Sequence, residues 1–200
     1  YNFNVLLMTL TKQRQKKLWS YLKYNTVDYE TYPTSRENTR LYAILFRKIF
    51  DLPLTGPVDP LSLLDKLHFV FGNVDYEILP ESDFSNNIPA KCLPLSDGSF
   101  LIQISETVFD RAYQHNSGGD RMHILHEIVH PFADKIGFKP IYNRALKNKT
   151  ILPYRSLEWI VKSITGEIMM PYDETAGMSV QELMYTYGVS EQAAKQRQKY

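Results

Sequence analysis

The chain has 200 residues, of which 23 are basic and 22 acidic, and its formal net charge is +1. A balance this close to neutral creates no global field that would favour nucleic acid or an anionic membrane. No apolar run is long enough to span a bilayer, and the run from Val5 to Met8 is too short for a signal peptide. The single cysteine, Cys92, excludes an internal disulfide and suits a reducing compartment, so we expect a cytoplasmic protein.

The first part of the chain predicts helices. Residues 11–24 combine an apolar stripe with several basic residues, a pattern typical of a helix with one solvated face. A capping-box spacing from Thr34 to Glu37 predicts a second helix. Asp59 followed by Pro60 predicts the start of a short third helix. In the second helix we expect four aliphatic side chains to face the core: Leu41, Ile44, Leu45 and Ile49.

The middle of the chain predicts a small sheet. Three β-prone runs follow one another, from His68 to Phe71, from Val74 to Leu79 and from Phe100 to Ile104. A turn signal at Ser96 to Ser99 precedes the third run, and a helix from Ser105 to about Tyr113 follows it. Helices therefore flank a short antiparallel or mixed sheet, which favours an α+β fold.

We expect three regions along the chain. Residues 1–40 form an amino-terminal helical extension, and residues 41–178 form the main domain. Residues 179–200 add two helices, capped by Ser179 and Ser190, that pack on the same domain or extend it.

One run, from His126 through Glu127 to His130, contains side chains that can bind a metal ion and transfer a proton. On a helix, residues four apart lie on one face, so the two histidines can offer ring nitrogens to one metal ion. Glu127 is rotated towards a water on that metal, and H-E-x-x-H is the signature of zinc-dependent peptidases. Asp120 is a candidate N-cap for this helix, which we expect to be packed in the core.

A catalytic zinc site needs a third protein ligand and an open fourth position. Glu158 lies near the start of an apolar-periodic helix that runs from about residue 155 to 170, next to the buried face of that helix. Glu167 on the same helix and Asp134 beyond the motif are the alternatives. We expect the Glu167 side chain to be solvated.

From about Ala43 to the C-terminus the chain resembles the ImmA/IrrE family of zinc metallopeptidases, which occurs in bacteria, phages and mobile elements. Four features carry the resemblance, and their order matters more than any one of them. They are the helix and β-prone stretch from Pro57 to Leu79, the strand from Ser99 to Ser105 with the Arg121 to His130 motif after it, the acidic helix from Glu158 to Pro171, and the V-S-x-x-A-x-x-x-R tail from Val189 to Arg197.

The resemblance implies a gluzincin-like endopeptidase with a zincin-like helical core. Zn²⁺ would be bound by His126, His130 and Glu158, with Glu127 as general base and then general acid. The implied substrate is an exposed linker in a partner such as a helix-turn-helix repressor, and we expect neither membrane binding nor direct nucleic-acid binding. His115, Tyr142 and Tyr154 are candidates for oxyanion or substrate contacts. We expect the substrate to pair with an edge strand made of Phe100, Leu101, Ile102, Gln103 and Ile104.

The chain departs from the family pattern at three places. Val129 stands where the family usually has glycine. Pro131 removes a backbone donor and its ring clashes with the carbonyl of Glu127, so we expect the motif helix to kink or end there. The family's E-x-E-A-N-x-F-A run is here Glu158 to Thr165, and it keeps only the first acidic position.

Two other classes of function stay open. In one, the chain keeps the fold but acts as a binding or regulatory module, because Pro131 has distorted the motif. In the other, a structural zinc holds two helices together, with a fourth ligand from His123, Asp134 or His115. An open site favours the peptidase, whereas a closed four-ligand site favours the structural role.

Overall fold

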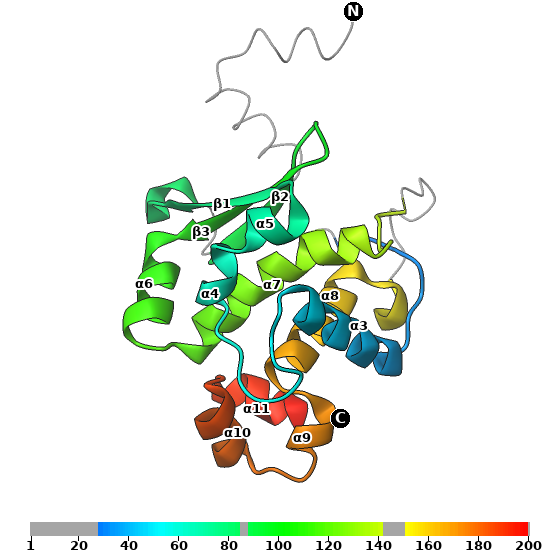
Figure 1. The fold of residues 1–200 in the computed structure, drawn as a ribbon, viewed down its shortest axis with the longest axis vertical. Coiled ribbons are helices and arrows are strands. Elements are labelled where there is room, and N and C mark those ends of the chain that lie inside the picture. The colour runs from blue at the N-terminus through cyan, green and yellow to red at the C-terminus, as the bar shows by residue number, and fades with distance from the viewer. Residues whose placement is uncertain (1–27, 85–87, 142–150, 200) are drawn as a thin grey trace, which may run out of the picture.

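The fold is seen in a computed structural model that describes residues 28–84, 88–141 and 151–199 (Figure 1). The predicted helix over residues 11–24 lies outside these ranges. The elements in chain order are α3 (Arg36–Ile49), α4 (Leu61–Leu64), α5 (Leu67–Phe71), β1 (Val74–Leu79), η1 (Glu81–Asp83), β2 (Ala90–Pro94), β3 (Phe100–Ser105), α6 (Glu106–Gln114), α7 (Gly118–Lys135), η3 (Pro153–Arg155), α8 (Leu157–Met169), α9 (Tyr172–Thr175), α10 (Val180–Tyr187) and α11 (Glu191–Arg197).

The three strands form one mixed sheet in the order β1-β3-β2. β1 pairs with β3 in parallel, and β2 pairs with β3 antiparallel. A turn joins β2 to β3, in which Asp97 Oδ1 accepts the Ser99 N–H and Gly98 takes a φ of 84° that suits glycine. A mixed sheet among helices confirms the α+β class.

The strand prediction was wrong in two respects. β3 is the central strand, paired on both sides, so Phe100 to Ile104 do not form an edge. The run from His68 to Phe71 is helical and belongs to α5, which ends at Gly72 with a left-handed φ of 76°. Pairing is decided by distant segments, and a short apolar run has no period that separates strand from helix.

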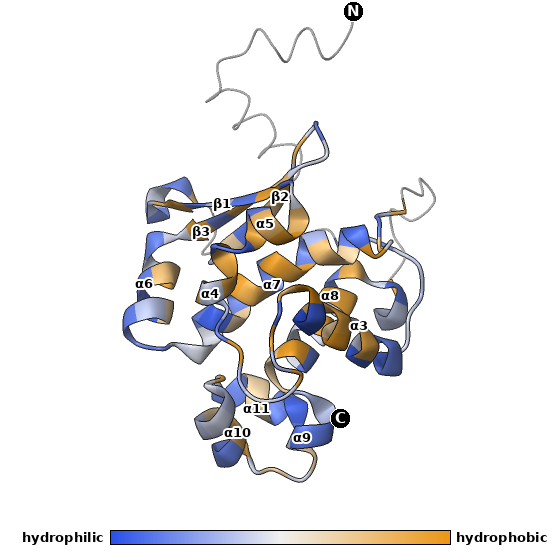
Figure 2. Ribbon diagram, in the orientation of Figure 1, coloured by the Kyte–Doolittle hydropathy of each residue, from blue (hydrophilic) through white to orange (hydrophobic). Residues whose placement is uncertain are grey.

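Helix α7 runs through the middle of the molecule and packs against α8 and the sheet (Figure 1). Its core side is fully buried, and its apolar residues appear as orange bands that alternate with paler and blue ones (Figure 2). The helix starts after the N-cap Ser117, so Asp120 lies in its first turn and not at its cap. It also continues through Pro131 to Lys135. The proline therefore does not end the motif helix, although Glu127 loses one backbone hydrogen bond.

Helix α3 packs on α8 with the face opposite to the predicted one. Its buried side includes Ala43, Phe46 and Phe50, together with the fully buried Arg47. The Arg47 guanidinium donates to the backbone carbonyls of Ile168, Pro53, Thr55 and Gly56, which compensates for the burial of its charge. The four aliphatic residues expected to face inward are exposed. The expected domain boundary at residue 40 also falls inside this helix.

The C-terminal helices are tied to the core by buried polar contacts. Arg197 of α11 reaches Glu167 of α8 at 2.7 Å, with both side chains almost fully buried. Tyr187 of α10 donates to Glu174 at 2.7 Å. The prediction that Glu167 is solvated was therefore wrong. Its partner Arg197 is 30 positions away, beyond the reach of helical periodicity. The predicted caps at Ser179 and Ser190 are confirmed.

Gly118, the first residue of α7, lies against the connection between α10 and α11. A Cβ there would come within 2.5 Å of the Gly188 carbonyl oxygen and 2.7 Å of the Ser190 nitrogen. We therefore expect Gly118→Ala to lower the free energy of unfolding by about 1–3 kcal/mol, because backbone must move to make room. Urea unfolding followed by circular dichroism measures this change.

Gly119→Ala is the matched control for that substitution. A Cβ at Gly119 would meet nothing within 4 Å, so alanine there should be neutral or should stabilise the helix by about 0.5–1 kcal/mol. Equal stabilities of the two variants would contradict the tight contact at Gly118.

Within the three described ranges, no helix combines the length and the apolarity that a membrane crossing requires.

Candidate metal centre

Helix α7 places the polar side chains of the motif away from its fully buried face, with His126 and His130 16% and 19% exposed. Ile124, Leu125, Ile128 and Val129 are completely buried, so the helix cannot rotate without exposing them. His126 and His130 then lie one turn apart, with their rings edge-on and their centroids 4.8 Å apart. Their Nε2 atoms approach to 3.2 Å. The two ring nitrogens therefore point at one place.

Helix α8 brings Glu158 to the same place. Ser156 caps this helix by accepting the Trp159 N–H, and Asp28 accepts the Glu158 N–H, so the first turn is held firmly. Glu158 Oε2 lies 3.3 Å from His126 Nε2, and Glu158 Oε1 lies 3.4 Å from His130 Nε2. One carboxylate thus faces both imidazoles.

These separations fit a zinc ion. Tetrahedral zinc with nitrogen and oxygen ligands at about 2.0–2.1 Å requires ligand atoms about 3.3 Å apart. The two Nε2 atoms lie 3.2 Å apart, and each has one oxygen of Glu158 beside it, Oε2 at 3.3 Å from His126 and Oε1 at 3.4 Å from His130. His126, His130 and Glu158 could therefore hold the metal with little rearrangement.

The protonation states also suit metal ligands. The hydrogen bond from His126 is the main cause that lowers the pKa of Glu158 to about 2, with the charges of both histidines and Lys162 acting in the same direction and burial opposing. Burial is the main cause that lowers the pKa of His130 to about 3. An ionised carboxylate and a neutral imidazole are the forms that bind metal.

Glu127 is close to the two histidines but differs from Glu158. Among the described residues, one of its oxygens lies within 4.8 Å of the histidine ligand atoms. Its carboxylate accepts the backbone N–H of Cys92, which turns it towards β2. Burial raises its pKa to about 7, the charge of Glu158 adds to this, and His126 opposes it. Glu127 is therefore a half-buried carboxyl that exchanges a proton near neutral pH in the metal-free protein.

The site opens into a cleft of about 670 Å³. Glu127 and Glu158 line one part of it, and Lys162 and Trp159 continue its wall along α8. Helix α11 lines it as well. The lining residues from β2 and its approach and from the C-terminal helices are Pro89, Ala90, Ser190, Gln192, Ala193, Gln196 and Arg197.

The structure does not bring the other predicted contacts to the cleft. His115 follows the C-terminal end of α6 and is exposed, and Tyr154 lies in η3 with its side chain towards solvent. Neither lines the cleft. Tyr142 lies outside the described residues. Among the residues considered as a fourth ligand, His123 lines the cleft, whereas Asp134 and His115 do not.

Two parts of the site could not be read from the sequence. The edge strand beside the cleft is β2, whose run of Ala90, Lys91 and Cys92 has weak β propensity. From the sequence, Cys92 indicated only that there is no internal disulfide and that the compartment is reducing, yet its backbone N–H contacts Glu127. The sequence also did not predict that α11 lines the cleft, because the residues of that helix were used only as one of the features of the family resemblance.

No protein family model matches the chain, and no curated protein sequence matches it. The likeness to the ImmA/IrrE peptidases therefore rests on the motifs within the chain itself.

Proposed function

We propose that this chain is a zinc-dependent endopeptidase. The observation that carries the proposal is the convergence of His126, His130 and Glu158 at the spacing of tetrahedral zinc ligands. The cleft beside them supports an open site. Of the candidates for a fourth ligand, Asp134 and His115 do not line the cleft, and His123 lines it but is not in the described group of His126, Glu127 and His130 whose ligand atoms lie within 4.8 Å of one another. We propose a regulatory role in a reducing cytoplasm, on the basis of the resemblance and of the single cysteine.

The proposed reaction assigns different tasks to the two carboxylates. Zinc, when bound, supplies polarisation of the peptide carbonyl and acidification of a water. Glu158 serves as a ligand because both of its oxygens face imidazole nitrogens. Glu127, held by the Cys92 N–H, takes a proton from the attacking water onto its carboxylate and passes it to the leaving amine.

The position of β2 supports an extended peptide as substrate. β2 pairs with β3 on one side, and no described strand pairs with its other side. Pro89 and Ala90 line the cleft at the start of this strand. A peptide laid along the outer edge of β2, where the Cys92 N–H already contacts Glu127, would be recognised mainly by its backbone, which suits cleavage of an exposed linker in a partner such as a helix-turn-helix repressor.

Zinc removal and replacement test this proposal. We expect the protein to bind one equivalent of zinc. Free zinc at 100 times its dissociation constant should raise the free energy of unfolding by about 2.7 kcal/mol. Chelation should abolish cleavage of a linker-containing repressor, and added zinc should restore it. Metal analysis, thermal unfolding and gel electrophoresis measure these effects. His68→Ala, an exposed histidine on α5, is the control and should change none of them.

The outcomes separate the candidate functions. A protein that binds no zinc contradicts the metal centre. A protein that binds zinc tightly and cleaves none of the candidate repressors favours the alternative, a zincin-fold binding or regulatory module with a structural zinc.

A further inference from the structure

The outward face of α3 presents apolar side chains that are exposed to solvent. Leu41 is 59% exposed, Leu45 42%, Ile49 41% and Ile44 39%. The opposite face of the same helix, with Ala43 and Phe46, is buried against α8, so apolar side chains lie on both faces of the middle of this helix. Such helices normally lie inside a protein, and an exposed apolar patch of this kind marks an interaction site.

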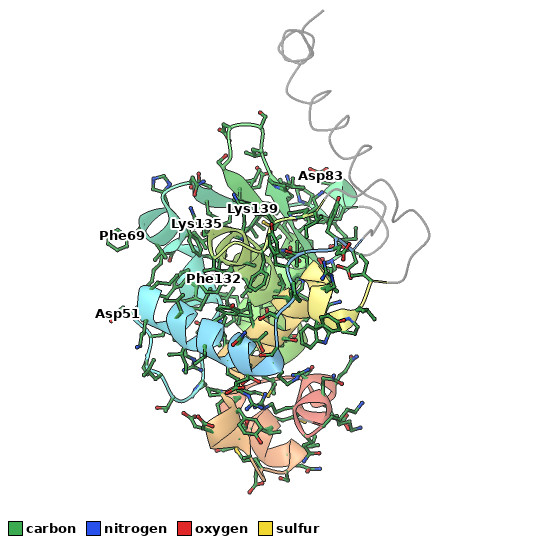
Figure 3. All side chains as sticks on the ribbon, turned by 90° about the vertical axis from the view of Figure 1, so that its right-hand side faces the viewer. Asp51, Phe69, Asp83, Phe132, Lys135 and Lys139 are labelled. Carbon is green, nitrogen blue, oxygen red and sulfur yellow. The ribbon has the colours of Figure 1, made fainter. Side chains whose placement is uncertain are left out.

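The place of α3 in the fold leaves this face accessible. The helix lies at the side of the molecule, outside α8 (Figure 1). Seen from that side, it lies in front of α8, and no described helix stands before it (Figure 3). None of the four aliphatic side chains is buried, and none belongs to the hydrophobic core of the described residues.

The exposed face has a charge at each end. Glu37 lies in the first turn and Lys48 in the last turn, and both are exposed. They are 11 positions apart, or about 16 Å along the helix axis. Leu41, Ile44 and Leu45 lie between them. The sequence of the face is therefore acidic, aliphatic and basic from its N-terminal to its C-terminal end.

This pattern is complementary to itself in the reverse direction. In an antiparallel pair of α3 helices, Glu37 of each copy lies opposite Lys48 of the other, and the aliphatic side chains meet at the centre. A parallel pair would place like charges side by side and align the helix dipoles unfavourably. Leu41 and Leu45 lie four residues apart, with Asn38 and Lys48 three residues beyond them, so the face has the alternating spacing of a helix-pairing seam with a polar residue at each end.

We propose that α3 mediates a two-fold symmetric dimer of this chain through its outward face. The inference does not rest on the peptidase proposal. The contact is isologous, as expected for a homodimer, with Leu41, Ile44 and Leu45 near the axis and two Glu37–Lys48 pairs at the rim. One helix of 14 residues buries less area than a standard interface, so the dimer is weak and dissociates in the micromolar range.

Sedimentation of the full chain over micromolar to submillimolar concentrations tests the dimer. The average mass should rise from that of a monomer to that of a dimer, and Leu45→Glu should keep it at the monomer value. The control is Phe69→Glu, which replaces a 92% exposed aromatic on α5 and should leave the dimer intact. Circular dichroism checks that both variants are folded.

Charge exchange tests the antiparallel register. Glu37→Lys or Lys48→Glu should each weaken the dimer by about five- to tenfold, because each change places like charges together twice. The double variant should recover the wild-type dissociation constant to within about twofold. A monomer at every concentration, a dimer that tolerates Leu45→Glu, or a double variant no tighter than the single variants would overturn the proposal.

Discussion

Replacing Glu127 with glutamine is expected to lower kcat/KM for peptide cleavage by about 10²–10⁴-fold. Glutamine keeps the size of the side chain and can still contact the Cys92 backbone, but it cannot take a proton from water. His126, His130 and Glu158 are unchanged, so the variant should still bind one equivalent of zinc. Cleavage rates and metal content, measured on the same preparation, separate these two effects.

The control for this variant is Glu106→Gln, an exposed glutamate in the first turn of α6. It should change neither zinc content nor cleavage. Cleavage that persists at the wild-type rate in Glu127→Gln would rule out Glu127 as the general base. Loss of zinc from that variant would instead assign Glu127 a role in metal binding.

The largest effect on stability is expected at the buried ion pair between Arg197 and Glu167. The side chains are 6% and 2% exposed, and Arg197 also donates to Thr175 at 2.9 Å. Arg197→Met would leave the Glu167 charge buried, with Arg40 at 3.8 Å as its other ion-pair partner in the described part of the chain. We expect the free energy of unfolding to fall by about 3 kcal/mol, the lower end for a broken buried pair, because Arg40 compensates in part. Urea unfolding measures the loss.

The same helix contains a matched control for this prediction. Lys195 and Glu191 form an ion pair of 2.6 Å on α11, but both side chains are 61% exposed. Lys195→Met should therefore cost less than about 1 kcal/mol. The double variant Arg197→Met/Glu167→Leu should be more stable than Arg197→Met alone, since no unpaired charge stays buried. Equal losses for Arg197→Met and Lys195→Met would contradict the role of burial.

The two stability tests also bear on the cleft. Arg197 and Gly118 both hold the C-terminal helices in place, and α11 forms part of the cleft wall. If the proposed function holds, a substitution at either position should disturb substrate binding more than zinc binding, because the proposed ligands lie on α7 and α8.

The local part of the site was predictable because a helix has a fixed repeat. Four positions make just over one turn, so His126 and His130 share a face wherever the helix packs. The capped start of α8 likewise placed Glu158 near the apolar side of that helix. The convergence of all three at zinc-ligand spacing, however, depends on how α7 and α8 pack against each other.

The errors share one physical origin. Residues 41 to 46 are all apolar, so two opposite stripes of α3 fit the helical repeat equally well, and only packing on α8 selects Ala43 and Phe46. β3 became the central strand because β2 closes back on it through the Asp97–Gly98 turn. Glu167 is buried because Arg197 compensates for its charge from another helix.

The sequence by itself determined the α+β class, the helical placement of the two histidines, the β-prone runs of β1 and β3, and the caps of the last helices, since each depends on contacts between near neighbours. Tertiary structure decided which face of α3 is buried, which strand forms the edge beside the cleft, and that α11 lines that cleft. These features depend on segments that are distant in sequence, and their contacts form only when the chain is folded.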